Sequence, residues 1–136
     1  MPTLSPTQTR AKAPQLTPKQ LEAFFKAKLA AECGPHDVKR RQAAYDTNFI
    51  LLDVREREAF EEEHIKGAVN IPASALPTRL KELPKHKEII TYCWSVTCTL
   101  APRTALLLAS KGYRVKELVG GIGEWKSYGF PVEKGT

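Results

Sequence analysis

Two of the three cysteines in this chain, Cys93 and Cys98, belong to the segment CWSVTC. Cys93 directly follows the apolar run at 89–92, which is typical of a buried strand in a parallel sheet. Ligands of open α/β sheets bind where such strands end. A helix is expected to begin near 99–102, so a thiol in this loop would face unpaired N–H groups and the positive end of a helix dipole. The N–H groups and the helix dipole both favour the thiolate, so Cys93 is the candidate nucleophile. The alternative interpretation is that Cys93 is a small residue of the core, as free cysteines often are.

The remaining elements must hold this loop in place. From Thr17, a capping residue, and Pro18, apolar residues recur at helical spacing to about Cys33. A second short helix is expected over 38–45. Further along the chain we expect strands at 49–54, 68–70, 89–93 and 114–118, and helices at 56–62, 73–80, 99–111 and 121–129. Strands that alternate with helices at these spacings predict an α/β fold with a central, mainly parallel sheet.

The 136 residues, 42% of them hydrophobic and 26% charged, fit one globular domain. We expect a disordered tail over 1–16, an N-terminal helical segment packed on the domain over 17–48, and the main domain over 49–136. No apolar run approaches the ~20 residues of a membrane span, so no membrane partner is expected. Three cysteines are too few for a disulfide scaffold, which predicts a reduced, cytoplasmic setting.

The net charge of +6 comes mostly from residues 1–41. This basic end lacks the aromatic interleaving and the motif of a nucleic-acid module, so we predict a solvated face and no nucleic-acid partner. His and Cys residues do not cluster at ligand spacing, so neither a metal site nor a cofactor is expected.

The segment from Leu51 to Glu133 resembles the rhodanese-like family of sulfurtransferases. The resemblance is carried by the following residues in order: Asp53-Val54-Arg55, Glu58, Phe60, the segment His64 to Pro72, the strand ending at Cys93, Gly120-Gly121-Ile122, Trp125, Gly129 and Pro131-Val132. They extend over some 80 of the 136 residues. The N-terminal helices and the WSVTC loop resemble a single-domain subgroup with a longer active loop that contains two cysteines.

The resemblance implies a three-layer fold, a central mainly parallel sheet flanked by helices, with extra N-terminal helices. It also implies that a cysteine attacks the outer sulfur of a small anionic donor such as thiosulfate and forms a persulfide. That sulfur then passes to a thiol, cyanide or a carrier protein. Carried over by position, Cys93 is the nucleophile, Trp94, Ser95, Val96, Thr97 and Cys98 form the substrate-binding loop, and Asp53 and Arg55 are framework residues.

The active loop departs from the usual pattern of the family. That pattern has six residues, opens with the cysteine, and often contains glycine and ends in arginine. Here 94–98 holds no glycine and no base, and the nearest cation is Arg103. Counted from Cys98, Arg103 falls at the usual cysteine-to-arginine spacing, so Cys98 is the alternative nucleophile. Cys93 is favoured because it ends a buried strand, and because a helix that began a full loop after Cys98 would have barely two turns before Gly112.

If Cys93 is the nucleophile, Cys98 is a candidate resolving thiol, with an inert loop thiol as the other interpretation. The second function considered is a non-catalytic binding module that uses the same cleft for a partner protein. A phosphatase is disfavoured because that chemistry needs a cysteine separated from an arginine by five residues, and neither cysteine has one there.

Overall fold

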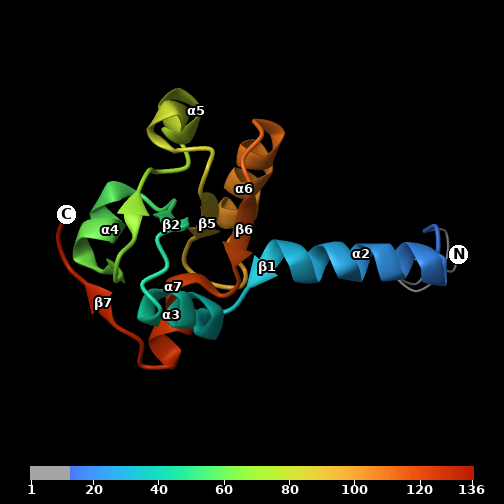
Figure 1. Ribbon diagram of the computed structural model, residues 1–136, viewed down its shortest axis with the longest axis horizontal. Coiled ribbons are helices and arrows are strands. Elements are labelled where there is room, and N and C mark those ends of the chain that lie inside the picture. Colours follow the sequence, from blue (N-terminus) through green and yellow to red (C-terminus); the bar gives the residue numbers. More distant parts are fainter. Residues whose placement is uncertain (1–12) are drawn as a thin grey trace, which may run out of the picture.

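The computed structural model describes residues 13–136. Its centre is a five-stranded sheet in which every neighbouring pair of strands is parallel. Helices cover both faces and make three layers (Figure 1). The strand order is β1 (Glu32–Cys33), β6 (Val115–Leu118), β5 (Glu88–Tyr92), β2 (Phe49–Asp53) and β4 (Val69–Asn70). The predicted α/β fold with a central parallel sheet is confirmed.

The two central strands, β2 and β5, are buried on both faces. Leu51 and Ile90 point into one apolar cluster, whereas Leu52 and Ile89 point into the other. Because both faces of the sheet are covered, these strands show continuous apolar runs and no alternation of apolar and polar residues. The first cluster packs against α3 (Pro35–Ala43) and α7 (Gly121–Ser127), and the second against α5 (Leu76–Arg79), η1 (Leu80–Glu82) and α6 (Leu100–Ser110).

The register of β2 and β5 determines what meets at the end of the sheet. Asp53, the last residue of β2, pairs with Tyr92, the last residue of β5. The residues that follow the two strands, Val54-Arg55 and Cys93-Trp94, therefore leave the sheet side by side. Arg57–Glu62 then form α4, and a second, antiparallel sheet joins β3 (His64–Ile65) to β7 (Val132–Glu133).

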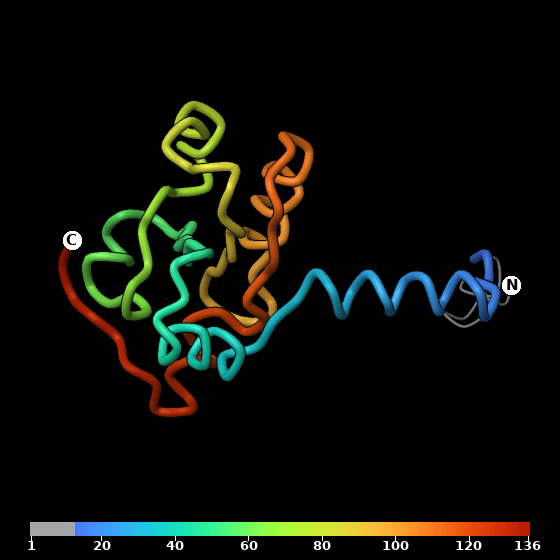
Figure 2. The backbone as a smooth tube through the Cα atoms, in the orientation of Figure 1, coloured from blue at the N-terminus to red at the C-terminus, as the bar shows by residue number. Residues whose placement is uncertain are grey.

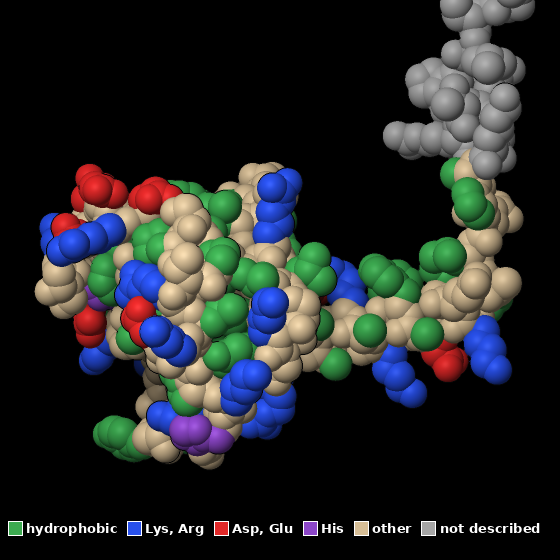
Figure 3. All heavy atoms as spheres, turned by 90° about the horizontal axis from the view of Figure 1, so that it is seen from above, with side chains coloured by type: hydrophobic (Ala, Val, Ile, Leu, Met, Phe, Trp, Pro, Cys, Tyr) green, Lys and Arg blue, Asp and Glu red, His purple; other side chains and the backbone are tan. Residues whose placement is uncertain are grey.

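Helix α2 (Pro18–Ala31) starts where it was predicted. The Gln20 N–H donates to Thr17 Oγ1 over 3.2 Å, and the Thr17 N–H donates to Gln20 Oε1 over 2.9 Å, which is a capping box. None of its residues is buried. The helix extends away from the domain (Figure 1), and hydrophobic side chains are exposed along it (Figure 3). We expected the helices of 17–48 to pack on the domain. Instead, α2 runs without a turn into the edge strand β1, so its axis continues outward beyond the sheet.

Helix α3 does pack on the domain, through the fully buried side chain of Val38. Its N-cap is Gly34, whose N–H donates to Asp37 Oδ2 over 2.8 Å. The helix therefore begins earlier than the sequence predicted, because Asp37 caps it from the third helical position.

The predicted tail over 1–16 lies outside the described residues except for 13–16, which form no helix or strand. The start of α2 and the C-terminus lie at opposite ends of the molecule (Figure 2). Within residues 13–136, every helix is too short or too polar to cross a membrane.

Candidate active site at the end of strand β5

The loop after β5 folds back toward Cys93. The Cys93 side chain is buried, with 2% of the residue exposed, whereas Trp94 and Val96 are 51% and 71% exposed. The Cys98 N–H donates to the Ser95 carbonyl over 3.1 Å, and this turn reverses the chain. The Cys93 Sγ donates to the Cys98 carbonyl over 3.7 Å. The two cysteines that the sequence singled out are therefore brought together at the C-terminal end of the central strand.

The first turn of α7 holds the base of this loop. The Ile122 N–H donates to the Cys93 carbonyl over 3.0 Å, and the Gly123 N–H donates to the Trp94 carbonyl over 2.9 Å. Gly121 has a φ of +56°, and a Cβ on it would lie 2.2 Å from the Cys93 carbonyl oxygen. Only glycine fits this position, so Gly121 allows α7 to pack against the loop.

The two thiols differ in their tendency to ionise. Burial raises the pKa of Cys93 to about 11, and the Cys98 thiol contributes to the increase, while N–H groups of Ala101 and Trp94 oppose it. For Cys98, burial also raises the pKa, but hydrogen bonds from the Cys93 thiol and from the N–H groups of Trp94 and Leu100 outweigh it, so its pKa is lowered. The sequence predicted a thiolate at Cys93. Desolvation opposes that thiolate, because Cys93 is the more deeply buried of the two thiols.

A buried ion pair supports the other side of the loop. Arg55 and Asp53 are 1% and 0% exposed, and their side chains are joined by bonds of 2.7 Å (Nη2 to Oδ2) and 3.0 Å (Nε to Oδ1). The Arg55 guanidinium also donates to the Glu63 carbonyl over 2.6 Å and lies 4.4 Å from the centre of the Trp94 ring. The Asn70 side chain donates to the carbonyls of both Asp53 and Arg55, each over 2.9 Å. Asp53 and Arg55 thus connect β2 to β4 and to Trp94.

The structure does not bring Arg103 to the sulfur atoms. It is the fourth residue of α6 and is exposed, and its side chain makes no hydrogen bond or ion pair with any residue of 13–136. Ser95 Oγ and Thr97 Oγ1 are also exposed and lie 3.2 Å apart, within hydrogen-bond distance of each other. Within the described part of the chain, the hydrogen-bond donors next to the two sulfur atoms are main-chain N–H groups and the Cys93 thiol itself.

Other side chains that could take part in chemistry, outside the loop, make structural contacts or are buried. The His64 ring stacks on Phe60 with centroids 3.7 Å apart, and its Nδ1 lies 2.7 Å from the Phe60 carbonyl oxygen. Burial raises the pKa of Cys33 to about 11. Across residues 13–136, no group of three or more metal-binding side chains comes together.

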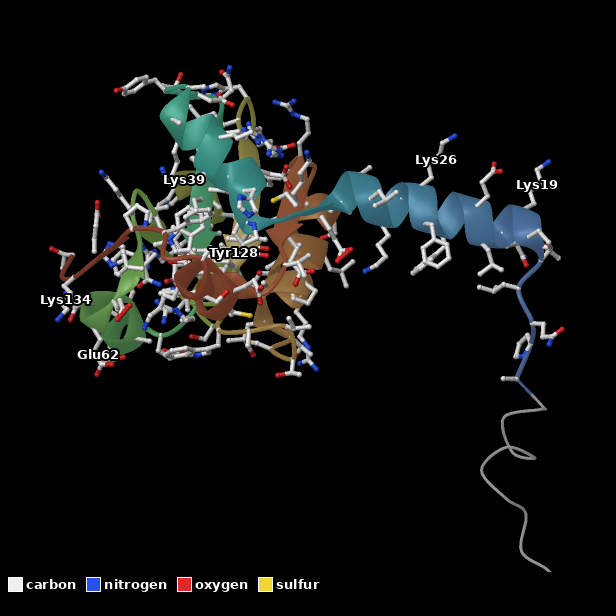
Figure 4. All side chains as sticks on the ribbon, turned by 90° about the horizontal axis from the view of Figure 1, so that it is seen from below. Lys19, Lys26, Lys39, Glu62, Tyr128 and Lys134 are labelled. Carbon is white, nitrogen blue, oxygen red and sulfur yellow. The ribbon has the colours of Figure 1, made fainter. Side chains whose placement is uncertain are left out.

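A cavity of about 310 Å³ lies beside the active loop. It is lined by residues of both charges and by the indole of Trp94: Arg55, Glu62, Glu63, Trp94, Lys126 and Lys134. Glu62 and Lys134 lie on the same side of the domain, at the α4 end (Figure 4). Lys126 pairs with Glu63 at 2.9 Å. The sequence indicated Arg55 and Trp94 but not the four other residues, because the group comes from the segment after β2, α4, the active loop, α7 and the C-terminal segment.

Known proteins share both the sequence and the fold. Residues 34–128 match the model of the rhodanese-like domain. A helix-turn-helix-type transcriptional regulator of Mycobacterium tuberculosis, Rv0324, is 39% identical over 99 residues, which cover 73% of this chain and 42% of the regulator. This chain thus spans less than half of the regulator's length. A protein of Allochromatium vinosum named sulfurtransferase is 32% identical over 93 residues, covering 67% of this chain and 85% of that protein.

The structural comparison agrees with the sequence comparison. The crystal structure of the BH2092 protein from Bacillus halodurans is similar with a TM-score of 0.79 and 37% sequence identity, and the match covers 87% of each chain. The matched family region extends from the N-cap of α3 to the end of α7, so it includes four of the five strands of the central sheet (β2, β4, β5 and β6) and the whole cysteine loop. This chain belongs to the rhodanese-like domain family.

Proposed function

We propose that this protein is a sulfurtransferase that accepts sulfane sulfur on Cys93 and passes it to a thiophilic acceptor. The observation that carries the proposal is the position of Cys93: it ends a buried central strand, next to the start of α6, with N–H groups of Trp94 and Ala101 directed at its sulfur. Main-chain donors in this arrangement stabilise a sulfur anion without any charged side chain. The sulfurtransferase of Allochromatium vinosum, which shares the family, supports this reaction class.

Cys93 reacts as the thiolate, and its proton passes to solvent. The Cys93 thiolate then attacks the outer sulfur of a donor such as thiosulfate. The new bond joins Cys93 Sγ to that sulfur, the sulfur–sulfur bond of the donor breaks, and sulfite leaves with the bonding electron pair. A thiol, cyanide or a carrier protein subsequently attacks the outer sulfur of the persulfide and restores the Cys93 thiolate.

The surroundings of the loop bear on the choice of donor. The donor is a small anion, because the groups around Cys93 are N–H donors at the start of a helix. The neighbouring cavity adds little to this choice, because its lysines, Lys126 and Lys134, are matched by Glu62 and Glu63. Between Trp94 and Pro102 the sequence has no base, so main-chain dipoles supply most of the stabilisation at the sulfur itself.

Persulfide formation on a defined cysteine tests this function. The reduced protein is incubated briefly with thiosulfate, the reaction is stopped by alkylation, and peptide mass spectrometry locates the cysteine that has reacted, as a persulfide or as a loop disulfide. Cys93→Ser is expected to abolish the label on the loop peptide. Cys33→Ser, which removes a thiol outside the loop, is the matched control and is expected to label like the wild type. Full labelling of the loop peptide in Cys93→Ser would assign the reaction to Cys98 instead.

One observation favours a second candidate, a non-catalytic binding module. Cys93 is only 2% exposed and its pKa is raised, and a relative with 39% identity is named as a transcriptional regulator. A binding module produces no thiocyanate from thiosulfate and cyanide and carries no persulfide on any cysteine. Thiocyanate production that depends on the loop cysteines excludes it.

A further inference from the structure

The loop contains a second thiol that the transfer reaction does not consume. Cys98 is the last residue of the CWSVTC segment, and the turn from Ser95 to Cys98 brings it back to Cys93. The Cys93 Sγ lies 3.7 Å from the Cys98 carbonyl oxygen, and the Trp94 N–H is shared between the surroundings of both sulfur atoms. Both cysteines are free in this structure. A persulfide on Cys93 would therefore form within reach of another thiol of the same loop.

We infer that Cys98 resolves the Cys93 persulfide, so that the loop releases the bound sulfur as sulfide and closes as a Cys93–Cys98 disulfide. This inference rests on the proposed function, because it starts from the Cys93 persulfide. The Cys98 thiolate attacks Cys93 Sγ, the inner sulfur. A bond forms between the two cysteine sulfurs, and the bond between Cys93 Sγ and the outer sulfur breaks. The outer sulfur leaves as hydrosulfide with the electron pair.

The electrons balance within the loop. The two cysteine sulfurs are oxidised to a disulfide and the sulfane sulfur is reduced to sulfide, so this step needs no external oxidant. A dithiol reductant, such as a reduced dithiol protein or dithiothreitol, returns the loop to two thiols by thiol–disulfide exchange. The full cycle converts a sulfane-sulfur donor and a dithiol into sulfide and an oxidised dithiol.

Three features make Cys98 suited to this attack. It is the more exposed of the two thiols, and its pKa is lowered, so the attacking group is present as the thiolate at lower pH than an ordinary cysteine. It lies on the same loop as its target, which gives it the advantage of an intramolecular reaction over any thiol in solution. The leaving group, hydrosulfide, is the anion of a stronger acid than cysteine and departs readily.

The test compares what happens to the sulfur when no external thiol is present. The reduced, desalted protein is mixed with thiosulfate, the reaction is stopped by alkylation, released sulfide is captured with a bimane reagent, and the loop peptide is mapped by mass spectrometry. The wild type is expected to release about one equivalent of sulfide per chain and to contain a Cys93–Cys98 disulfide. Cys98→Ser is expected to retain a stable persulfide on Cys93 and to release at least about tenfold less sulfide. Cys33→Ser is the control and is expected to behave like the wild type.

The outcomes separate the inference from the proposed function. A wild-type protein that holds a Cys93 persulfide while Cys98 is alkylated overturns the resolving role and leaves the sulfurtransferase proposal intact. The wild-type result decides this point even if Cys98→Ser does not fold. Persulfide and disulfide both absent from wild type and variant would overturn the sulfurtransferase proposal as well. Sulfide release that is equal in the wild type and in folded Cys98→Ser would show that the sulfur leaves by another route.

Discussion

Gly121→Ala tests whether the contact between α7 and the active loop holds the site together. A left-handed φ costs a residue with a Cβ about 1–2 kcal/mol. The new Cβ would also lie 2.2 Å from the Cys93 carbonyl oxygen, a main-chain atom that no side-chain rotation can move. Relief requires α7 to separate from the loop, which weakens the hydrogen bonds from Ile122 and Gly123 at about 1 kcal/mol each. We expect a total loss of about 3–4 kcal/mol.

Gly129→Ala is the matched control for this substitution. Gly129 also has a positive φ, +73°, but a Cβ there would meet no atom within 4 Å. Only the conformational cost remains, so we expect a loss of about 1–2 kcal/mol. Both variants make the same change to the unfolded chain, so the difference between them reports the contact with the loop.

Thermal unfolding and persulfide labelling measure the two consequences. For a domain of this size, 1 kcal/mol corresponds to about 3–5 °C in Tm, so Gly121→Ala is expected to melt about 9–20 °C below the wild type and Gly129→Ala about 3–10 °C below. At a temperature where both are folded, Gly121→Ala should also form the persulfide more slowly, because the Cys93 and Trp94 carbonyls have lost their anchors. Equal melting temperatures and equal labelling in the two variants would refute the reasoning.

Three further predictions concern the ion pair, a buried thiol and the loop. Asp53→Asn leaves the Arg55 guanidinium buried without its counter-charge and is expected to lower the free energy of unfolding in urea by about 3–5 kcal/mol, whereas Glu61→Gln, in an exposed pair, changes it little. Burial raises the pKa of Cys33 from 9.0 to about 11, so the folded state keeps this proton at a pH where the unfolded chain has lost it. The free energy of unfolding therefore falls as the pH rises from about 9 to about 11. Cys33→Ala is expected to remove this fall, which is on the order of 2 kcal/mol. Trp94→Ala removes an exposed side chain and a cation–π contact worth about 1 kcal/mol. It should still form the persulfide, because the hydrogen-bond donors at the sulfur are main-chain N–H groups. Loss of labelling would show that the indole itself holds the sulfur-donating substrate.

Some helices and strands of this fold could be predicted from their residues, and others could not. The continuous apolar runs of β2 and β5 predicted the central parallel strands, because a strand covered on both faces has no polar side. The two-residue strands β1, β3 and β7 were not predicted, since two residues are too few for any periodicity. Helix α2 was predicted from its cap and its spacing, but its direction was not. The pairing of β1 at the edge of the sheet determines that direction.

Some features of the candidate site could likewise be predicted from the sequence, and others depend on the tertiary structure. The residues alone indicated a cysteine at the end of a buried strand and a second cysteine in the same loop, because residue type and order along the chain carry that information. Asp53 and Arg55 were added by the resemblance to the rhodanese-like family. The different surroundings of the two thiols were determined only in three dimensions, because the desolvation of Cys93 and the N–H groups near each sulfur depend on how the loop folds back. The packing of α7 against the loop is also a tertiary property. It brings Gly121 so close to the loop that a Cβ on this residue would lie 2.2 Å from the Cys93 carbonyl oxygen.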